Sequence, residues 1–434
     1  MCRTPLILAF AALTIASAAQ KPGGSAAQPP IGQRFWPQWR GPHASGISRT
    51  AQPPVEWSET KNIRWKIELP GRGAATPVIW GDRVYVPTAV PADRTAGVRS
   101  VHRFVVMAIN RKDGSIAWQR TAKEEAPHEG THQEFGTMAS PSAVTDGEHV
   151  IVSFESRGIF AYDMNGAPVW QKDLGDKRMR NEFGEGSSPA LHNDKLFVVW
   201  DHQGESFIAA LNKRTGQEIW RTKRDEIDSW STPLVVEHDG RAQVITGAMR
   251  GVRSYDAETG QVVWETGGLT MNPIPSPVAA DGLVILMSGF RGNSLKAIRL
   301  ADAKGAVTGA PAIAWTLDRD TPYVPSPLLY DGTLYFMKSN NALISAFDAK
   351  TGKPYYQAQR IEALPGNVFA SPVGAAGRVY VLGQEGTAVV LKHGPTLDLL
   401  GTNKLDDRFD ASPALVDREM YLRGYKNLYC VAEK

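Results

Sequence analysis

The chain has 434 residues, of which 42% are hydrophobic, 9% aromatic and 21% charged. This composition excludes an intrinsically disordered chain, which would have fewer aromatic and more charged residues. The formal net charge at pH 7 is only +3, so we expect no nucleic-acid partner. The 41 glycines and 29 prolines are spread along the chain and indicate many turns between short elements. An all-β fold is therefore favoured.

Residues 1–19 have the pattern of a secretory signal peptide. Arg3 supplies a positive charge, Leu6 to Ile15 form an apolar stretch, and Ser17-Ala18-Ala19 offers a cleavage site of small residues. The stretch is too short to span a bilayer as a helix. Cys2 precedes it, whereas the lipid-bearing cysteine of a lipoprotein follows such a stretch. We therefore expect an exported protein, periplasmic or extracellular, that is no lipoprotein and has no transmembrane span after cleavage.

A repeated dipeptide predicts the fold. A serine or threonine followed by proline occurs eight times before a short apolar run, with 41 to 64 residues between successive prolines. Such periods are typical of four-stranded propeller blades of about 40–50 residues. The eight motifs are Thr76-Pro77, Ser140-Pro141, Ser188-Pro189, Thr232-Pro233, Ser276-Pro277, Ser326-Pro327, Ser371-Pro372 and Ser412-Pro413.

A second motif, Asp-x-x-Thr-Gly-x-x-x-Trp, follows in most repeats. It runs from Asp256 to Trp264, and variants run from Asn212 to Trp220 and from Asp348 to Tyr356. Asp or Asn can accept backbone hydrogen bonds in the turn, and Gly adopts the positive φ that closes a tight hairpin. The aromatic residue is expected to pack against the neighbouring blade as a structural residue. Looser repeats place Trp118, Trp170 and Trp315 at this position.

Eight motifs predict eight blades, but the last repeat ends at Lys434 before its outer strand. Residues 61–66 look like an outer strand without a repeat of its own. We therefore predict an eight-bladed propeller of four-stranded antiparallel blades over residues 62–434, with the ring closed by an N-terminal strand. Residues 35–61 are expected to pack on the propeller. The Gly, Ser and Pro content of residues 20–34 indicates a flexible linker.

The two motifs resemble the pyrroloquinoline quinone (PQQ) repeat of quinoprotein alcohol dehydrogenases and of the outer-membrane assembly factor BamB. The resemblance extends over nearly the whole chain after the signal peptide. The opening Phe35-Trp36-Pro37-Gln38-Trp39-Arg40-Gly41-Pro42 is similar to exported BamB-related propellers. The resemblance implies the propeller fold and, from BamB, binding to protein partners through loops or blade edges. A fold does not by itself fix a function.

The sequence lacks the motifs of a quinoprotein dehydrogenase. The adjacent Cys-Cys pair and the haem motif Cys-x-x-Cys-His of that family are missing, and no segment matches its catalytic Asp or its calcium-binding Glu and Asn. PQQ and calcium therefore stay alternatives that no motif supports, although oxygen ligands for calcium are plentiful. The sequence identifies no catalytic residue and no metal ligand.

Residues His128 to His132 match the zinc-protease pattern His-Glu-x-x-His. A zinc site needs this pattern on a helix, so that both imidazoles lie on one face. Pro127 precedes the segment, Gly130 lies inside it, and no apolar period of 3.6 flanks it. We therefore expect a polar loop here.

The residues before each Pro motif should begin the innermost strands and surround the mouth of the central channel. Their mixture of carboxylates, amides, arginines and aromatic rings suits a small polar molecule, a sugar or a metal ion. A hydrated channel without a ligand is the alternative. The residues are Arg72, His132, Glu134, Glu182, Glu185, Asp228, Trp230, Asn272, Tyr323, Asn367, Asp407, Arg408 and Asp410.

Two functions fit these observations. The first is an exported, non-enzymatic scaffold that binds proteins, including those of the cell envelope in the sense that the BamB resemblance implies. The second is a periplasmic enzyme or sensor that binds PQQ, a metal or a saccharide in the central funnel. An enzyme would concentrate paired carboxylates and bases at one place. Here such residues are spread over about five blades or more, which favours the scaffold.

Export gives a first testable prediction. N-terminal sequencing of exported material should begin at Gln20, because cleavage is expected after Ala19. A cytosolic chain that still begins with Met1 would contradict secretion.

Overall fold

Short β-strands joined by tight turns make up most of the chain. The computed structural model describes residues 1–2, 31–93, 97 and 99–433. The expected signal peptide and most of the expected linker fall on residues 3–30, which lie outside this part. The helices within it are all short 3-10 turns, and none is long and apolar enough to cross a membrane. They are η1 (Ile31–Arg34), η2 (Glu155–Arg157), η3 (Arg180–Glu182) and η4 (Leu300–Asp302).

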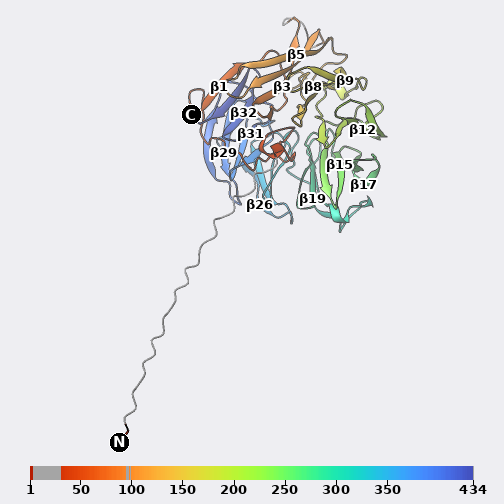
Figure 1. The fold of residues 1–434 in the computed structure, drawn as a ribbon. Coiled ribbons are helices and arrows are strands. Elements are labelled where there is room, and N and C mark those ends of the chain that lie inside the picture. Colours follow the sequence, from red (N-terminus) through yellow and green to blue (C-terminus); the bar gives the residue numbers. More distant parts are fainter. Residues whose placement is uncertain (3–30, 94–96, 98, 434) are drawn as a thin grey trace.

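The strands form eight antiparallel sheets around a central channel (Figure 1). Within each blade the strands follow one another from the channel outward. Blade 1 contains β2 (Val78–Trp80), β3 (Arg83–Pro91), β4 (His102–Asn110) and β5 (Ile116–Glu125). Blade 2 contains β6 (Val144–Thr145), β7 (His149–Ser153), β8 (Ile159–Asp163) and β9 (Pro168–Lys172). Blade 3 contains β10 (Ala190–His192), β11 (Lys195–Trp200), β12 (Phe207–Asn212) and β13 (Glu218–Lys223). Blade 4 contains β14 (Leu234–His238), β15 (Arg241–Gly247), β16 (Gly251–Asp256) and β17 (Val262–Gly267).

The second half of the ring repeats this order. Blade 5 contains β18 (Val278–Ala280), β19 (Leu283–Ser288), β20 (Ser294–Arg299) and β22 (Ile313–Leu317). Blade 6 contains β23 (Leu328–Tyr330), β24 (Thr333–Met337), β25 (Leu343–Asp348) and β26 (Pro354–Arg360). Blade 7 contains β27 (Val373–Ala375), β28 (Arg378–Leu382), β29 (Thr387–Lys392) and β30 (Leu399–Lys404). Blade 8 contains β31 (Ala414–Val416), β32 (Glu419–Arg423), β33 (Asn427–Ala432) and β1 (Ile63–Glu68). The predicted eight-bladed, all-β propeller is confirmed.

The N-terminal strand β1 closes the ring, as the sequence predicts. It pairs antiparallel with β33, placing Trp65 opposite Cys430 and Ile67 opposite Leu428. In Figure 1 the red-orange β1 lies beside the blue strands of the C-terminus. Cys430 is fully buried, and burial raises the pKa of its thiol to about 12. It is therefore a core residue held in its uncharged form.

A ring of buried hydroxyl groups joins the blades at the start of their inner strands. Seven times, a backbone N–H of one blade donates to the Oγ of the next blade, at 2.9–3.3 Å. The ring is completed by the Thr76 hydroxyl, which donates to the carbonyl of Ser412 at 3.1 Å. In every blade except blade 2, the serine or threonine of the motif is therefore the hydrogen-bonding partner of the preceding blade. The members are Thr76, Ser142, Ser188, Thr232, Ser276, Ser326, Ser371 and Ser412.

Blade 2 differs from the motif predicted for it. Ser142, and not Ser140 of Ser140-Pro141, accepts the hydrogen bond from Thr76 N–H and donates its own N–H to Ser188. The proline thus stands one residue before the hydroxyl, where the other blades have it one residue after. The hydroxyl acceptor is the constant feature because it satisfies a buried N–H group.

The outer tryptophans pack against the next blade, as expected. Trp170 of blade 2 donates through Nε1 to the carbonyl of Lys213 in blade 3 at 2.8 Å. Its indole lies over Gly216, where a Cβ atom would come within 2.6 Å of the ring. Glycine is needed there for this contact as well as for its φ of +70°. Equivalent hydrogen bonds are made by Trp65, Trp118, Trp220 and Trp315.

Two blade edges depart from this arrangement. Beside blade 4, the insertion of blade 5 adds β21 (Gly305–Ala306), which pairs parallel with β17. Trp264 is fully buried there, and its Nε1 donates to Gln243 Oε1 in its own blade at 3.1 Å. In blade 7, Gly401 occupies the position of the tryptophan, as its pairing with Val390 shows. Trp57 of the N-terminal segment is buried nearby and donates its backbone N–H to Asn403.

The N-terminal segment also enters the channel on one side of the hydroxyl ring. Its red ribbon lies inside the circle of blades in Figure 1. Trp39 Nε1 donates to the Ser276 hydroxyl of the ring at 3.0 Å. Arg40 is 1% exposed and donates to the carbonyls of Pro327 and Pro372. Burial lowers the pKa of this guanidinium to about 9. The N-terminal segment therefore occupies this lower side of the ring, where a hollow of about 370 Å³ remains between it and the inner strands of blades 3 to 5. A separate cavity lies on the opposite, upper side.

Trp264→Ala tests the packing between blades 4 and 5. The side chain is fully buried and shares a core cluster with Leu300, Ala303 and Val307 of the neighbouring blade. Its removal should lower the free energy of unfolding by about 3–5 kcal/mol in chemical denaturation. The matched control is Val262→Ala on the same strand, where the side chain is 47% exposed. A loss of less than about 1 kcal/mol for Trp264→Ala would mean that this contact is unimportant for stability.

Candidate functional site

A cavity of about 280 Å³ lies on the upper side of the channel, above the hydroxyl ring. Every one of the eight connections between blades contributes at least one residue to its lining. The lining contains six of the residues that the sequence placed around the channel mouth: His132, Glu185, Trp230, Asn272, Tyr323 and Asp410. The other lining residues are Ala74, Phe135, Gly136, Thr137, Ser140, Phe183, Gly186, Ile274, Val324, Asn340 and Phe369.

Aromatic rings form much of the cavity wall. His132 lies between Phe183 and Phe135, with ring centroids 5.2 and 5.0 Å apart. Phe135 in turn packs on Phe369 of blade 7 at 4.7 Å. Because His132 and Phe135 belong to the connection between blades 1 and 2, this connection reaches across the channel mouth. The aromatic row narrows the entrance to the cavity.

These three phenylalanines are not among the residues predicted from the sequence, although all lie close to predicted ones. The prediction of a polar channel favoured polar neighbours such as Glu134 and Glu182. Glu134 is exposed and pairs with Arg408 at 3.8 Å. Glu182 pairs with Arg99 and accepts the N–H of Gly130 at 3.1 Å. The phenylalanine rings line the cavity, whereas the carboxylates of Glu134 and Glu182 pair with Arg408 and Arg99 outside it.

Asp410 is the carboxylate of the cavity with the most partners. It accepts hydrogen bonds from Gln384 Nε2 at 2.7 Å and from the Tyr425 hydroxyl. Burial raises the pKa of Asp410, and the two hydrogen bonds together with Arg408 and Arg72 oppose that rise. The two guanidinium groups lie over the Tyr425 ring, at 5.2 and 4.4 Å from its centroid. Arg72 and Arg408 thus border the cavity without lining it.

Glu185 belongs to a buried charge network behind the cavity wall. It accepts the Ser156 N–H at 3.0 Å and lies 3.9 Å from Lys177 Nζ. Lys177 forms a closer pair with Glu155 at 2.8 Å, and both are almost fully buried. Burial raises the pKa of Glu155, against the opposing charge of Lys177. Burial also opposes the charge on Lys177, but the two carboxylates outweigh it and raise the pKa of that amine. The network joins the segment between β7 and β8 of blade 2 to the connection between blades 2 and 3.

Three further predicted residues lie away from the cavity and have structural partners. Asp407 accepts the backbone N–H groups of Tyr425 and Asn427 at 3.0 and 2.9 Å, which fixes the turn between β32 and β33. Asp228 is buried and accepts the N–H of Arg180 at 3.0 Å. Asn367 is exposed and forms a backbone bridge with Asn341.

The His-Glu-x-x-His segment is a loop in which each side chain has another partner. His128 Nε2 lies 2.5 Å from the carbonyl of Lys177, and Glu129 accepts the Met179 N–H at 2.9 Å. His132 faces the phenylalanines of the cavity wall. The segment lacks the helix that would place both imidazoles on one metal, as its proline and glycine predict.

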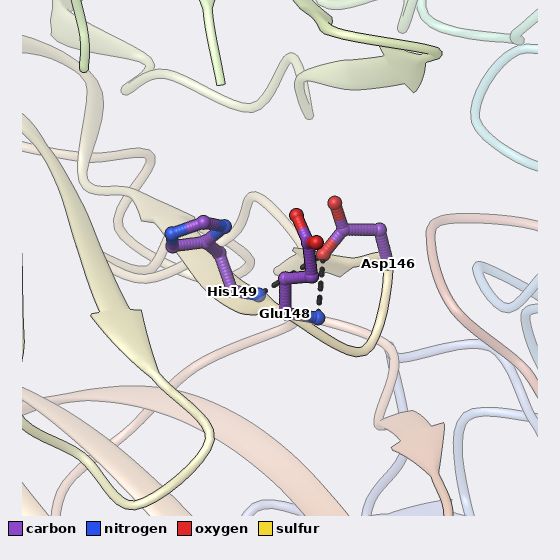
Figure 2. Close-up of side chains that lie close together, drawn as sticks. All are labelled: Asp146, Glu148 and His149. Atoms are coloured by element: carbon purple, nitrogen blue, oxygen red, sulfur yellow. Dashed lines mark hydrogen bonds between the residues drawn. The ribbon is translucent and has the colours of Figure 1, made fainter. Parts of the chain in front are cut away.

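Asp146, Glu148 and His149 form the one cluster of potential metal ligands in the described part of the chain (Figure 2). Asp146 Oδ1 accepts the N–H groups of Glu148 and His149 at 2.9 and 3.0 Å, which shapes the turn between β6 and β7. Lys213 and Arg214 of blade 3 pair with the two carboxylates at 2.6 and 2.9 Å. Burial opposes the charge on Asp146, but Lys213 and the N–H groups outweigh it and lower its pKa. These ion pairs indicate a contact between blades 2 and 3.

The cavity does not fit PQQ. That cofactor carries three carboxylates, whereas the residues described as lining the cavity include Glu185 and Asp410 and neither lysine nor arginine. An anion would meet two acidic groups, because the cations that partly compensate them (Lys177, Arg72 and Arg408) lie outside the lining. A calcium site in the cavity also lacks support, because the close cluster of ligands in the described residues lies elsewhere.

A second hollow lies on the outer side of the ring, between blades 1 and 2. It has a volume of about 350 Å³ and is lined by β5 and by β8 and β9. Arg120 and Thr121 of β5 face Pro168 and Val169 of β9 across it. Val169 is 44% exposed. This groove lies along β5, which at ten residues is the longest strand described.

Comparisons with known proteins agree with the fold. The family model described as "Outer membrane protein assembly factor BamB" matches residues 48–204, 158–311 and 305–431. Tetrathionate hydrolase of Acidithiobacillus ferrooxidans is 28% identical over 235 residues, which are 49% of this chain and 42% of the relative. BamB of Yersinia pestis is 26% identical over 251 residues, 53% of this chain and 59% of the relative. The matches thus span about half the length of these curated relatives.

Among solved structures, the quinohemoprotein alcohol dehydrogenase from Comamonas testosteroni has a TM-score of 0.66 at 12% identity. The alignment covers 92% of this chain and 81% of that one. At this identity the likeness concerns the fold alone. The three segments of the family model together cover nearly all of the propeller. The chain therefore belongs to the family of PQQ-like, BamB-related β-propellers.

Proposed function

We propose that the protein is an exported, non-enzymatic scaffold that binds a protein partner and acts as an assembly factor of the cell envelope. The observation that carries this proposal is the outer edge of β5, which pairs with no other strand of the described residues and lies beside the groove of blades 1 and 2. An edge strand offers unpaired N–H and C=O groups that can pair with an extended segment of a partner. The groove beside it offers space for the side chains of such a segment.

Blade 1 is distinguished by the length of its outer strands. β3 and β4 have nine residues each and β5 has ten, whereas the outermost strands of the other blades have five to seven. A longer edge can form more hydrogen bonds with a partner. The edges of two other blades are already occupied. β21 pairs with β17, and Ser58 forms a bridge with Lys404 on β30.

Binding of a small molecule in the central cavity is a second candidate function. It is favoured by the aromatic wall of the cavity, since ligand sites are typically concave and mostly apolar with a few polar groups. An enzyme is not favoured. Asp410 is held by Tyr425 and Gln384, and Glu185 by Ser156 and Lys177. Neither carboxylate is paired with a histidine in the manner of an acid–base site.

Site-directed photo-crosslinking tests the scaffold. A photoreactive amino acid at Thr121 or Val169, on opposite sides of the groove, should crosslink the same protein partner in the cell envelope. The matched control is Leu399, which is 51% exposed and accessible at the start of β30, a shorter strand of another blade whose far end is bridged by Ser58 at Lys404. Crosslinks of equal strength at all three positions, or at none, would contradict partner binding at β5.

A further inference from the structure

The central cavity has features that specify the chemistry of a ligand, and the inference drawn from them rests on the second function proposed above. Its volume of about 280 Å³ is just below the range of roughly 300–1,000 Å³ for small-molecule pockets. A ligand of this size has one or two rings.

Two of the aromatic side chains are fixed before any ligand enters. Trp230 Nε1 donates to the carbonyl of Gly184 at 2.8 Å. Tyr323 is stacked on Phe290, with centroids 4.7 Å apart. Side chains that are already ordered lose little conformational entropy on binding. These two rings can therefore serve as preformed platforms for the apolar face of a ligand ring.

Asn272 contributes a buried acceptor without a partner. Its side chain is in the lining and only 4% of the residue is exposed. The amide forms a side-chain hydrogen bond with Tyr323, which fixes its position, whereas its Oδ1 accepts no hydrogen bond from the described residues. Most buried polar atoms have such a partner, and leaving one unpaired is costly. The residue also has a φ of +52°, a conformation in which asparagine is better tolerated than most residues. A ligand that donates a hydrogen bond would satisfy this oxygen.

The charges around the cavity disfavour both anions and organic cations. An anion meets Glu185 and Asp410 with no cation in the described lining. An organic cation would gain little electrostatic stabilisation, because both carboxylates already have cationic neighbours. Lys177 lies 3.9 Å from Glu185, and the charges of Arg408 and Arg72 lower the pKa of Asp410 against the effect of burial. The carboxylate oxygens can still accept hydrogen bonds from neutral hydroxyl groups, since each offers several lone pairs. The site thus favours a neutral ligand that carries several donors.

We propose that the central cavity binds a neutral saccharide, whose ring packs on Trp230 and Tyr323 and whose hydroxyl groups donate to Asn272, Glu185 and Asp410. A sugar ring combines an apolar face of C–H groups with hydroxyl donors at its rim. The C–H face of the sugar can therefore pack on the two aromatic rings, while its hydroxyl groups donate to the two carboxylates and to the unpaired amide oxygen.

The test is a titration of the full mature chain with probes that share one ring and differ in charge. Saturation-transfer NMR and calorimetry would use glucose, galactose and N-acetylglucosamine as neutral probes, glucuronate as the anion and glucosamine as the cation. At least one neutral sugar should bind, and glucuronate should bind at least about tenfold more weakly than glucose or not at all.

A pair of variants assigns binding to the cavity. Asn272→Gly removes the unpaired oxygen and keeps a residue that tolerates positive φ, so affinity should fall about tenfold while the melting temperature is preserved. Asn193→Gly is the matched control, because Asn193 also has a positive φ of 52° but is exposed in the turn before β11. It should leave sugar affinity unchanged. Equal affinity of wild type and Asn272→Gly would overturn the assignment.

The two levels of the proposal fail in different ways. If glucosamine binds and every neutral sugar fails, the neutral saccharide is wrong while small-molecule binding in the cavity stands. If no probe binds to folded protein, both the saccharide and the second candidate function are overturned. Neither outcome affects the scaffold, whose test depends on β5.

Discussion

The architecture depends on the closed circle of hydrogen bonds that joins the eight inner strands. Seven of the buried hydroxyl groups accept the N–H group of the preceding blade, and the eighth, that of Thr76, donates to the Ser412 carbonyl. The start of every inner strand is therefore held at one level of the channel. The connections before these strands then converge above the ring and line one cavity. Below the ring, the N-terminal segment enters the channel, and Trp39 Nε1 donates a hydrogen bond to the Ser276 hydroxyl. The shape of the candidate ligand site therefore follows from the circle of hydroxyl hydrogen bonds between the inner strands.

Much of the fold could be predicted because its determinants recur at a fixed period. The Ser/Thr-Pro motif and the Thr-Gly-x-x-x-Trp motif mark the inner and outer strands. The lone strand predicted at residues 61–66, observed as β1 at Ile63–Glu68, indicated how the ring closes. The role of Ser142 could not be predicted from the repeats, because they are aligned on the proline of Ser140-Pro141, whereas the hydrogen bond uses the hydroxyl that follows this proline. The covering of blade 7 by Trp57 could not be predicted, because that contact joins residues from opposite ends of the chain and has no repeat.

The cavity was harder to predict than the fold. Its lining comes from connections that differ from blade to blade, so no period distinguishes an inward residue from its neighbour. Glu182 and Phe183 are adjacent, yet only Phe183 lines the cavity. Asp407 and Asp410 are three residues apart. Asp407 accepts hydrogen bonds from the backbone N–H groups of the β32–β33 turn, whereas Asp410 lines the cavity. Side-chain direction in irregular connections is set by tertiary contacts. The two proposed functions use separate surfaces, the outer edge of β5 and the upper end of the channel, and the protein can serve both.

Ring closure by β1 is tested most directly by two truncated proteins. One begins at Phe35 and keeps the contacts of the N-terminal segment with the channel and with blade 7, and the other begins at Gly71 and lacks β1. Thermal unfolding and light scattering would be measured for both, beside the mature chain. The first protein should melt like the mature chain. The second should melt at a lower temperature and aggregate, because the edge of β33 and the apolar residues Leu428 to Val431 become exposed. Identical melting of the two truncated proteins would contradict closure of the ring by this strand.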